Sequence, residues 1–133
     1  MNCKIPGKYL EDLEKLLRGE TIPGVKIFLV DHGTLKKIAG ENAKEYNFGA
    51  IRKSNGVKEI YINKDMNLGS KYGVGAHEFA HPYLPYGDEI GTDELAMKAL
   101  SNLSMDSTKP VDIRVKAEYA LKSLCDINEL SGN

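Results

Sequence analysis

The hydrophobic positions of the first thirty residues change from a helical to an extended pattern. Apolar side chains recur at helical spacing between Pro6 and Gly19, which predicts an amphipathic helix over residues 8–18. A Pro-Gly pair at 23–24 then precedes the run VKIFLV. Its length and β-branched content favour a strand over residues 25–30. The apolar face of the helix consists of Tyr9, Leu10, Leu13, Leu16 and Leu17.

Two alternating segments, 46–52 and 57–63, flank the pair Asn55-Gly56. Because both residues of this pair tolerate positive φ, the pattern predicts a β-hairpin. We expect the second strand, 57–63, to form the open edge that an extended peptide could join. Residues 33–40 between the first strand and the hairpin give no clear pattern beyond one short helical turn.

Three further helices follow the hairpin. Ser70 is the expected N-cap of the first, which ends at His81 because Pro82 follows. Thr92 or Asp93 caps the second, and Pro110 opens the last. The order predicts a single α+β domain over residues 1–133. Its elements are a small antiparallel or mixed sheet, an N-terminal helix, a central helix carrying 77–81 and two C-terminal helices.

Composition narrows the class of protein. The 133 residues are 41% hydrophobic and 28% charged, with a formal net charge of -1. With this balance the chain has no excess of Lys and Arg that would favour binding to nucleic acid or to an anionic membrane. No window reaches the ~20 apolar residues of a membrane helix. Charged residues recur among the first twenty positions, so these contain no apolar signal-peptide core. The two cysteines, Cys3 and Cys125, are expected to be reduced and buried, so the sequence predicts a soluble cytoplasmic protein.

The segment His77-Glu78-Phe79-Ala80-His81 is the strongest chemical signal. Two histidines four residues apart project from one helical face, where both imidazoles can reach one Zn²⁺. Glu78 is the expected general base and acid, because a neighbouring carboxylate can take a proton from metal-activated water. The alternative is a surface helix with two exposed histidines.

A catalytic zinc usually has a third protein ligand. Glu94, in the first turn of the next helix, is the preferred candidate, and Asp93 is the alternative. His32 is interpreted as a loop residue. Tyr83 and Tyr86 follow the metal helix and are candidate oxyanion stabilisers, although tyrosines near a proline-rich loop are more often packing residues.

The HEFAH segment, the hairpin before it and DELAMKAL at 93–100 resemble a minimal gluzincin metallopeptidase, similar to ImmA/IrrE-like peptidases and to the short minigluzincins. The resemblance covers about residues 45–104. It implies a zincin-like fold, zinc bound by His77, His81 and a downstream acid, and Glu78 as general base. It also implies an endopeptidase acting on a protein or peptide substrate.

Two alternatives to an active endopeptidase remain open. In the first, the chain is a latent zymogen or non-catalytic module. Residues 110–133 then form a regulatory segment that covers the cleft, within one chain or crosswise in a homodimer. Core formation explains their apolar residues equally well. In the second, a closed four-ligand zinc site, completed by His32 or Asp88, serves interaction without turnover.

Overall fold

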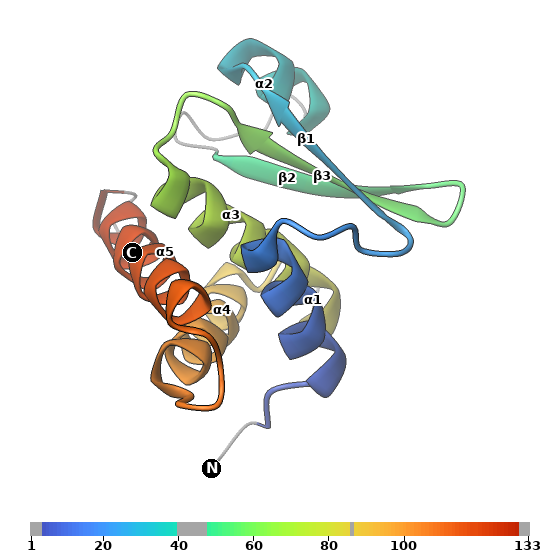
Figure 1. The fold of residues 1–133 in the computed structure, drawn as a ribbon. Helices are drawn as coiled ribbons and strands as arrows, with labels where there is room; N and C mark the ends of the chain where they lie inside the picture. The colour runs from blue at the N-terminus through green and yellow to red at the C-terminus, as the bar shows by residue number, and fades with distance from the viewer. Residues whose placement is uncertain (1–3, 40–47, 86, 131–133) are drawn as a thin grey trace.

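The computed structural model describes residues 4–39, 48–85 and 87–130, and over these residues the chain has an α+β fold. In Figure 1, α2 lies on one face of a small sheet, and the other helices lie on the opposite face. The predicted α+β class, with an N-terminal helix and two helices after the central one, is confirmed. The elements are α1 (Gly7–Arg18), β1 (Val25–Val30), α2 (His32–Ala39), β2 (Gly49–Ser54), β3 (Val57–Asn63), α3 (Leu68–Ala80), a 3-10 turn (His81–Tyr83), α4 (Glu89–Met105) and α5 (Val111–Leu130).

The sheet is mixed, with strand order β1-β3-β2. β2 and β3 form the predicted hairpin, whose turn residues Asn55 and Gly56 have φ of 52° and 78°. β1 pairs with β3 in parallel, so β3 is the central strand and buries Ile60 and Ile62. The expectation that 57–63 forms the open edge is therefore wrong. β1 and β2 are the edges, because the long-range β1 pairing occupies the second side of β3.

α3 lies between the sheet and the other helices. A Cβ atom added to Gly75 would come within 2.9 Å of a Leu16 methyl on α1 and 3.5 Å of Ile62 on β3. The buried Tyr9 hydroxyl of α1 donates a hydrogen bond to the Ala76 carbonyl at 2.7 Å. The helix that carries the HEFAH segment is thus held between a strand and a helix at close range.

α5 packs along α3 and α4 as part of the hydrophobic core. Its buried positions recur at helical spacing, at Ile113, Ala117, Ala120 and Leu124. A Cβ atom added to Gly73 of α3 would lie 3.0 Å from the Ala120 carbonyl oxygen, so the two backbones approach closely. The role of α5 in this structure is the core-forming one.

Local signals account for most element boundaries. α1 ends at Gly19, where φ of 72° gives the left-handed conformation expected of a glycine stop. Residues 32–39 form a full helix where the segment 33–40 gave no clear pattern beyond one short turn, because Asp31 accepts a hydrogen bond from the Thr34 amide and Leu35 is completely buried. The N-cap of α3 is Asn67 rather than Ser70, and the Ser70 amide donates to the Asn67 side chain at 2.8 Å.

Two further expectations concern cysteines and membranes. Cys125 is a free and exposed thiol on α5, so the expectation that it is buried is wrong. Cys3 lies outside the described residues. Within the described part of the chain, none of the helices combines the length and the apolar character that crossing a bilayer demands.

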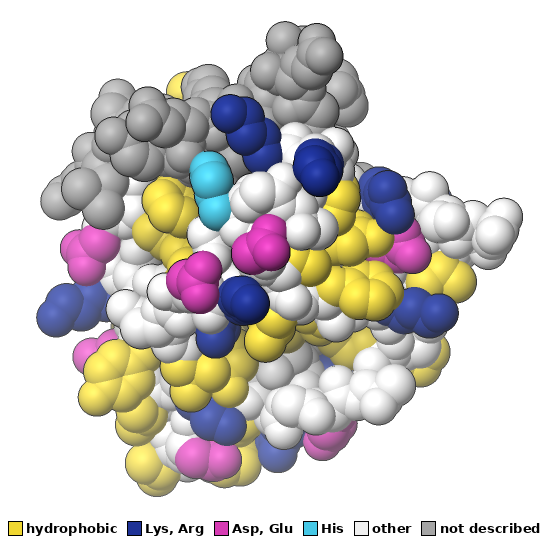
Figure 2. All heavy atoms as spheres, turned by 90° about the horizontal axis from the view of Figure 1, so that it is seen from above, with side chains coloured by type: hydrophobic (Ala, Val, Ile, Leu, Met, Phe, Trp, Pro, Cys, Tyr) yellow, Lys and Arg dark blue, Asp and Glu magenta, His cyan; other side chains and the backbone are white. Residues whose placement is uncertain are grey.

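Charges are mixed on the face that Figure 2 shows from above. Lys and Arg side chains alternate there with Asp and Glu, and hydrophobic side chains lie between them. This face therefore presents no extended field of one sign.

Candidate metal centre

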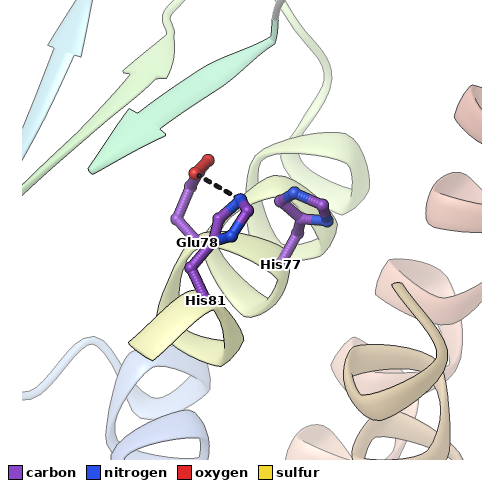
Figure 3. Close-up of side chains that lie close together, drawn as sticks. All are labelled: His77, Glu78 and His81. Atoms are coloured by element: carbon purple, nitrogen blue, oxygen red, sulfur yellow. Dashed lines mark ion pairs between the residues drawn. The ribbon is translucent and has the colours of Figure 1, made fainter. Parts of the chain in front are cut away.

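The end of α3 brings three side chains of the HEFAH segment together. His77, Glu78 and His81 each offer one ligand atom, and these atoms lie within 4.8 Å of one another. The two imidazole rings meet edge to face, with centroids 4.6 Å apart. Figure 3 shows both rings on one side of the helix and Glu78 pointing toward β2. The α-helix ends at Ala80, as the following Pro82 predicts, so His81 opens the 3-10 turn.

Hydrogen bonds to Nδ1 define which nitrogen each histidine presents to the site. His77 Nδ1 lies 2.5 Å from an Asp93 carboxylate oxygen, and His81 Nδ1 lies 3.5 Å from the Thr92 hydroxyl oxygen. The Thr92 hydroxyl donates its own proton to the Asp88 carbonyl, so toward His81 its oxygen acts as an acceptor. A proton on Nδ1 of each ring leaves both Nε2 atoms free to bind a metal.

Glu89 is the carboxylate that faces these two Nε2 atoms. Its Oε2 lies 3.1 Å from His77 Nε2 and 3.3 Å from His81 Nε2. The donor set is therefore two imidazoles and one carboxylate, which is a set found in catalytic zinc sites. These residues fit a zinc ion, and Glu89 is the candidate ligand that the sequence did not single out.

The start of α4 explains why Glu89 occupies this position. The N-cap is Asp88, which accepts a hydrogen bond from the Gly91 amide, and not Thr92 or Asp93 as expected. Gly91 therefore lies inside the helix, whereas a cap at Thr92 or Asp93 would place it before the helix. With α4 beginning at Glu89, Glu89 and Asp93 stand four residues apart on one face. That spacing is the signal that would have identified the pair.

The two predicted third ligands have different surroundings. Asp93 is buried and holds the Nδ1 side of His77, so it orients a ligand instead of facing the metal position. Glu94 is exposed on α4, five residues after Glu89, which corresponds to about 140° around the helix. The structure brings Asp93 to the site through His77 and does not bring Glu94 to the imidazoles.

The carboxyl group of Glu78 is buried beneath the first residue of β2. Glu78 is 3% exposed, and a Cβ atom added to Gly49 would lie 3.2 Å from its Oε2. Burial raises the pKa of Glu78 to about 7 in the metal-free chain. Its Oε1 lies 3.6 Å from His81 Nε2, at the edge of the metal position.

Three carboxylates concentrate negative charge around the imidazoles. Burial disfavours the charged form of His77, but the hydrogen bond to Asp93 and the surrounding carboxylates outweigh it and raise its pKa. Burial, followed by the charge of His77, lowers the pKa of His81. His77 therefore holds a proton more readily than an ordinary histidine, and His81 less readily. The carboxylates around the two rings favour a bound cation.

A groove of about 560 Å³ runs from these residues along β2. One end contains Glu78, His81 and Glu89, and the other end contains the far half of the hairpin. No described residue of α5 lines it, so the described part of α5 does not cover the groove within one chain; coverage crosswise in a homodimer stays a prediction. The described lining residues are Ile38, Gly49, Ala50, Ile51, Arg52, Lys53, Lys58, Glu78, His81, Pro82, Gly87 and Glu89.

The other sequence candidates lie elsewhere or outside the description. The Tyr83 ring packs against Tyr9 of α1, with centroids 5.6 Å apart, which agrees with the packing interpretation. Tyr86 lies outside the described residues. His32 is the exposed first residue of α2 and not part of a loop. Asp88 acts as a helix cap.

Comparisons of this chain with protein-family models, with curated proteins and with solved structures found no match. The functional interpretation therefore depends on the geometry of the site and the chemistry of its side chains.

Proposed function

We propose that this chain is a zinc-dependent endopeptidase that hydrolyses a peptide bond with Glu78 as general base and acid. The observation that carries the proposal is the convergence of His77 Nε2 and His81 Nε2 on one Glu89 oxygen, at 3.1 and 3.3 Å. This convergence lies beside a buried carboxyl group and at one end of a groove. Together these features meet the needs of metal-assisted hydrolysis.

Each residue has a distinct part in the proposed reaction. His77, His81 and Glu89 would hold the ion, which when bound polarises a carbonyl oxygen and lowers the pKa of water towards ~7. Glu78 accepts a proton during the attack and returns it to the leaving amine, because its Oε1 lies next to the ligand atom of His81. Asp93 keeps His77 in the tautomer that binds through Nε2.

The open edge of β2 supports a peptide substrate. The Phe48 carbonyl accepts a hydrogen bond from the Asn63 amide, and bonded pairs alternate along an antiparallel ladder. Gly49, Ile51 and Lys53 therefore direct their amides and carbonyls away from β3. An extended peptide can pair with these groups and cross the metal position beside Gly49. This role was expected for the 57–63 strand and is proposed here for its hairpin partner.

A closed zinc site without turnover is the second candidate, and one observation favours it. Glu78 lies close enough to both histidines to form a ligand group with them. If Glu78 bound the ion together with Glu89, the four positions of a structural site would be filled. The two candidates differ in what Glu78 does.

The Glu78→Gln variant separates the candidates. In the peptidase, it binds about one zinc per chain and loses peptide cleavage, since the amide cannot accept the proton. In the closed site, it loses zinc. Zinc is measured by mass spectrometry, and cleavage is measured on a peptide library with and without chelator. His81→Ala is the control that loses zinc in both cases, and retained cleavage in Glu78→Gln would refute the mechanism.

The proposed setting is the cytoplasm. The free thiol of Cys125 is compatible with a reducing compartment.

A further inference from the structure

Two lysines face each other in the groove, at the end away from the metal centre. Lys53 of β2 and Lys58 of β3 are directly opposite in the antiparallel register. Both line the groove that also contains Glu78 and His81. Side chains alternate along a strand, so Lys53 lies on the same face as Gly49, the face turned toward α3.

Lys53 and Lys58 have no carboxylate partner among the described residues, in contrast to the pair next to them. Arg52 and Glu59, on the other face of the hairpin, form an ion pair of 2.8 Å. The Arg52 guanidinium also lies over the Tyr61 ring, 5.1 Å from its centroid. Like charges directly opposite on a hairpin destabilise it. Arg52, which also lines the groove, is thus neutralised by Glu59, whereas Lys53 and Lys58 stand together on the face turned toward α3.

We propose that this lysine pair binds an acidic side chain of the peptide substrate. A carboxylate between two ammonium groups would replace their repulsion with two charge-assisted hydrogen bonds. The inference deepens the proposed peptidase function and depends on it, because it names the substrate class of the same groove. The substrate is a peptide with an aspartate or glutamate at a fixed distance from the cleaved bond.

The strand geometry gives that distance. Gly49 lies over Glu78, and Lys53 follows four residues later on the same strand. Four residues of extended chain span about 14 Å, so the acidic side chain lies roughly four residues from the cleaved bond. A peptide paired with β2 presents alternate side chains to this face, which excludes the neighbouring positions.

Peptide binding tests the lysine pair without relying on turnover. Fluorescein-labelled twelve-residue peptides, each with one Glu scanned along a Gln host, are titrated against zinc-loaded Glu78→Gln protein by fluorescence anisotropy. We expect Glu at one position to tighten binding about tenfold over the all-Gln host at low salt. The Lys53→Ala/Lys58→Ala double variant is expected to lose this preference, so that it binds the Glu and all-Gln peptides equally. Lys26→Ala/Lys122→Ala, which removes two exposed lysines outside the groove, keeps it.

A charge-reversal variant tests the inference even if the alanine variant fails to fold. Lys53→Glu/Lys58→Glu is expected to prefer a peptide with Lys at the same position, and circular dichroism checks that each variant is folded. Equal binding of Glu and Gln peptides by the parent protein would overturn the inference. So would lysine-dependent binding of a single-stranded oligonucleotide without any peptide preference, which would indicate a phosphate site.

The same peptides distinguish the inference from the proposed function. If wild-type protein cleaves the Glu and Gln peptides equally fast, the peptidase proposal is supported and the acidic preference is refuted. If the Glu peptide binds in a lysine-dependent manner and no peptide is cleaved, the lysine site is supported and the peptidase proposal fails.

Discussion

Glu89 and Glu94 lie on the same helix, and only the first faces the imidazoles. Glu89→Gln keeps the size of the side chain and weakens a metal bond, so we expect zinc affinity to fall on the order of 100-fold or more. Glu94→Gln makes the same chemical change on an exposed face and should leave zinc affinity unaltered. Competition with a chromophoric zinc chelator measures both values. Loss of affinity in Glu94→Gln alone would restore the first expectation from sequence.

The buried carboxyl group of Glu78 makes the metal-free protein sensitive to pH. An ordinary Glu has a pKa near 4.5, and burial raises that of folded Glu78 to about 7. Below pH 4.5 the group is neutral in both the folded and the unfolded chain. As the pH rises from 4.5 to 7 only the unfolded chain ionises, which lowers the free energy of unfolding by up to about 3 kcal/mol.

Glu78→Gln removes this titration and provides the test. With zinc removed, urea unfolding should show the variant more stable than wild type at pH 8, by up to about 3 kcal/mol, and nearly equal to it at pH 4. The difference between the two proteins isolates Glu78 from other titrating groups. A difference that stays constant from pH 4 to 8 would mean that Glu78 is not held neutral by burial.

At the scale of elements, α5 is the segment whose role the sequence left open. Its residue Leu124 is 2% exposed and packs against α3 near Gly73. Leu124→Ala should lower the free energy of unfolding by about 2–5 kcal/mol, and Lys122→Ala on the exposed side should change it little. Thermal or urea unfolding measures both. Truncation after Ser107 should abolish folding for the same reason.

Activity distinguishes a core helix from a cover. With α5 in the core, the cleavage rate per folded Leu124→Ala molecule equals that of wild type. A latency segment predicts the opposite, since loosening the cover would raise the rate. A rise in activity of the truncated chain with retained secondary structure would therefore argue for the zymogen alternative.

The elements that sequence predicted well are those with local signals. Apolar periodicity and Gly19 define α1, and Asn55-Gly56 defines the hairpin, because each depends on residues within one turn or strand. The strand order was missed, since the pairing of β1 with β3 joins residues about 33 positions apart, such as Val25 and Lys58. No local pattern encodes such a pairing.

The candidate site likewise has one part that local spacing predicts and another that depends on contacts between distant residues. His77, Glu78 and His81 were predicted because their spacing on one helix defines their geometry. Glu89 was missed because the position of a candidate ligand on a second helix depends on where that helix begins. Three residues, Asp88, Thr92 and Asp93, had cap chemistry, and Gly91 favoured the later start. The contact of α4 with α3 decides between them, and it is a tertiary interaction.

At the scale of the whole molecule, the site combines three segments that are distant in sequence. α3 and the 3-10 turn after it supply two imidazoles and a buried carboxyl group, α4 supplies a carboxylate facing them, and β2 supplies a strand edge with which no described strand pairs. The core positions these parts, because α3 is packed against β3, α1 and α5 at once. A peptide that reaches the candidate metal centre along the groove would therefore run beside β2.

Pairing along β2 predicts a period of two in the response to changes in the substrate backbone. An extended peptide beside Gly49, Ile51 and Lys53 directs alternate amides toward the strand and the others away from it. Methylating one peptide nitrogen at a time should lower kcat/KM about two- to tenfold at alternate positions and leave the intervening positions nearly unaffected. Zinc content stays the same throughout, since only the substrate changes. A flat profile, or losses confined to the cleaved bond, would mean that the substrate is held by its side chains and that the strand edge has no part in binding.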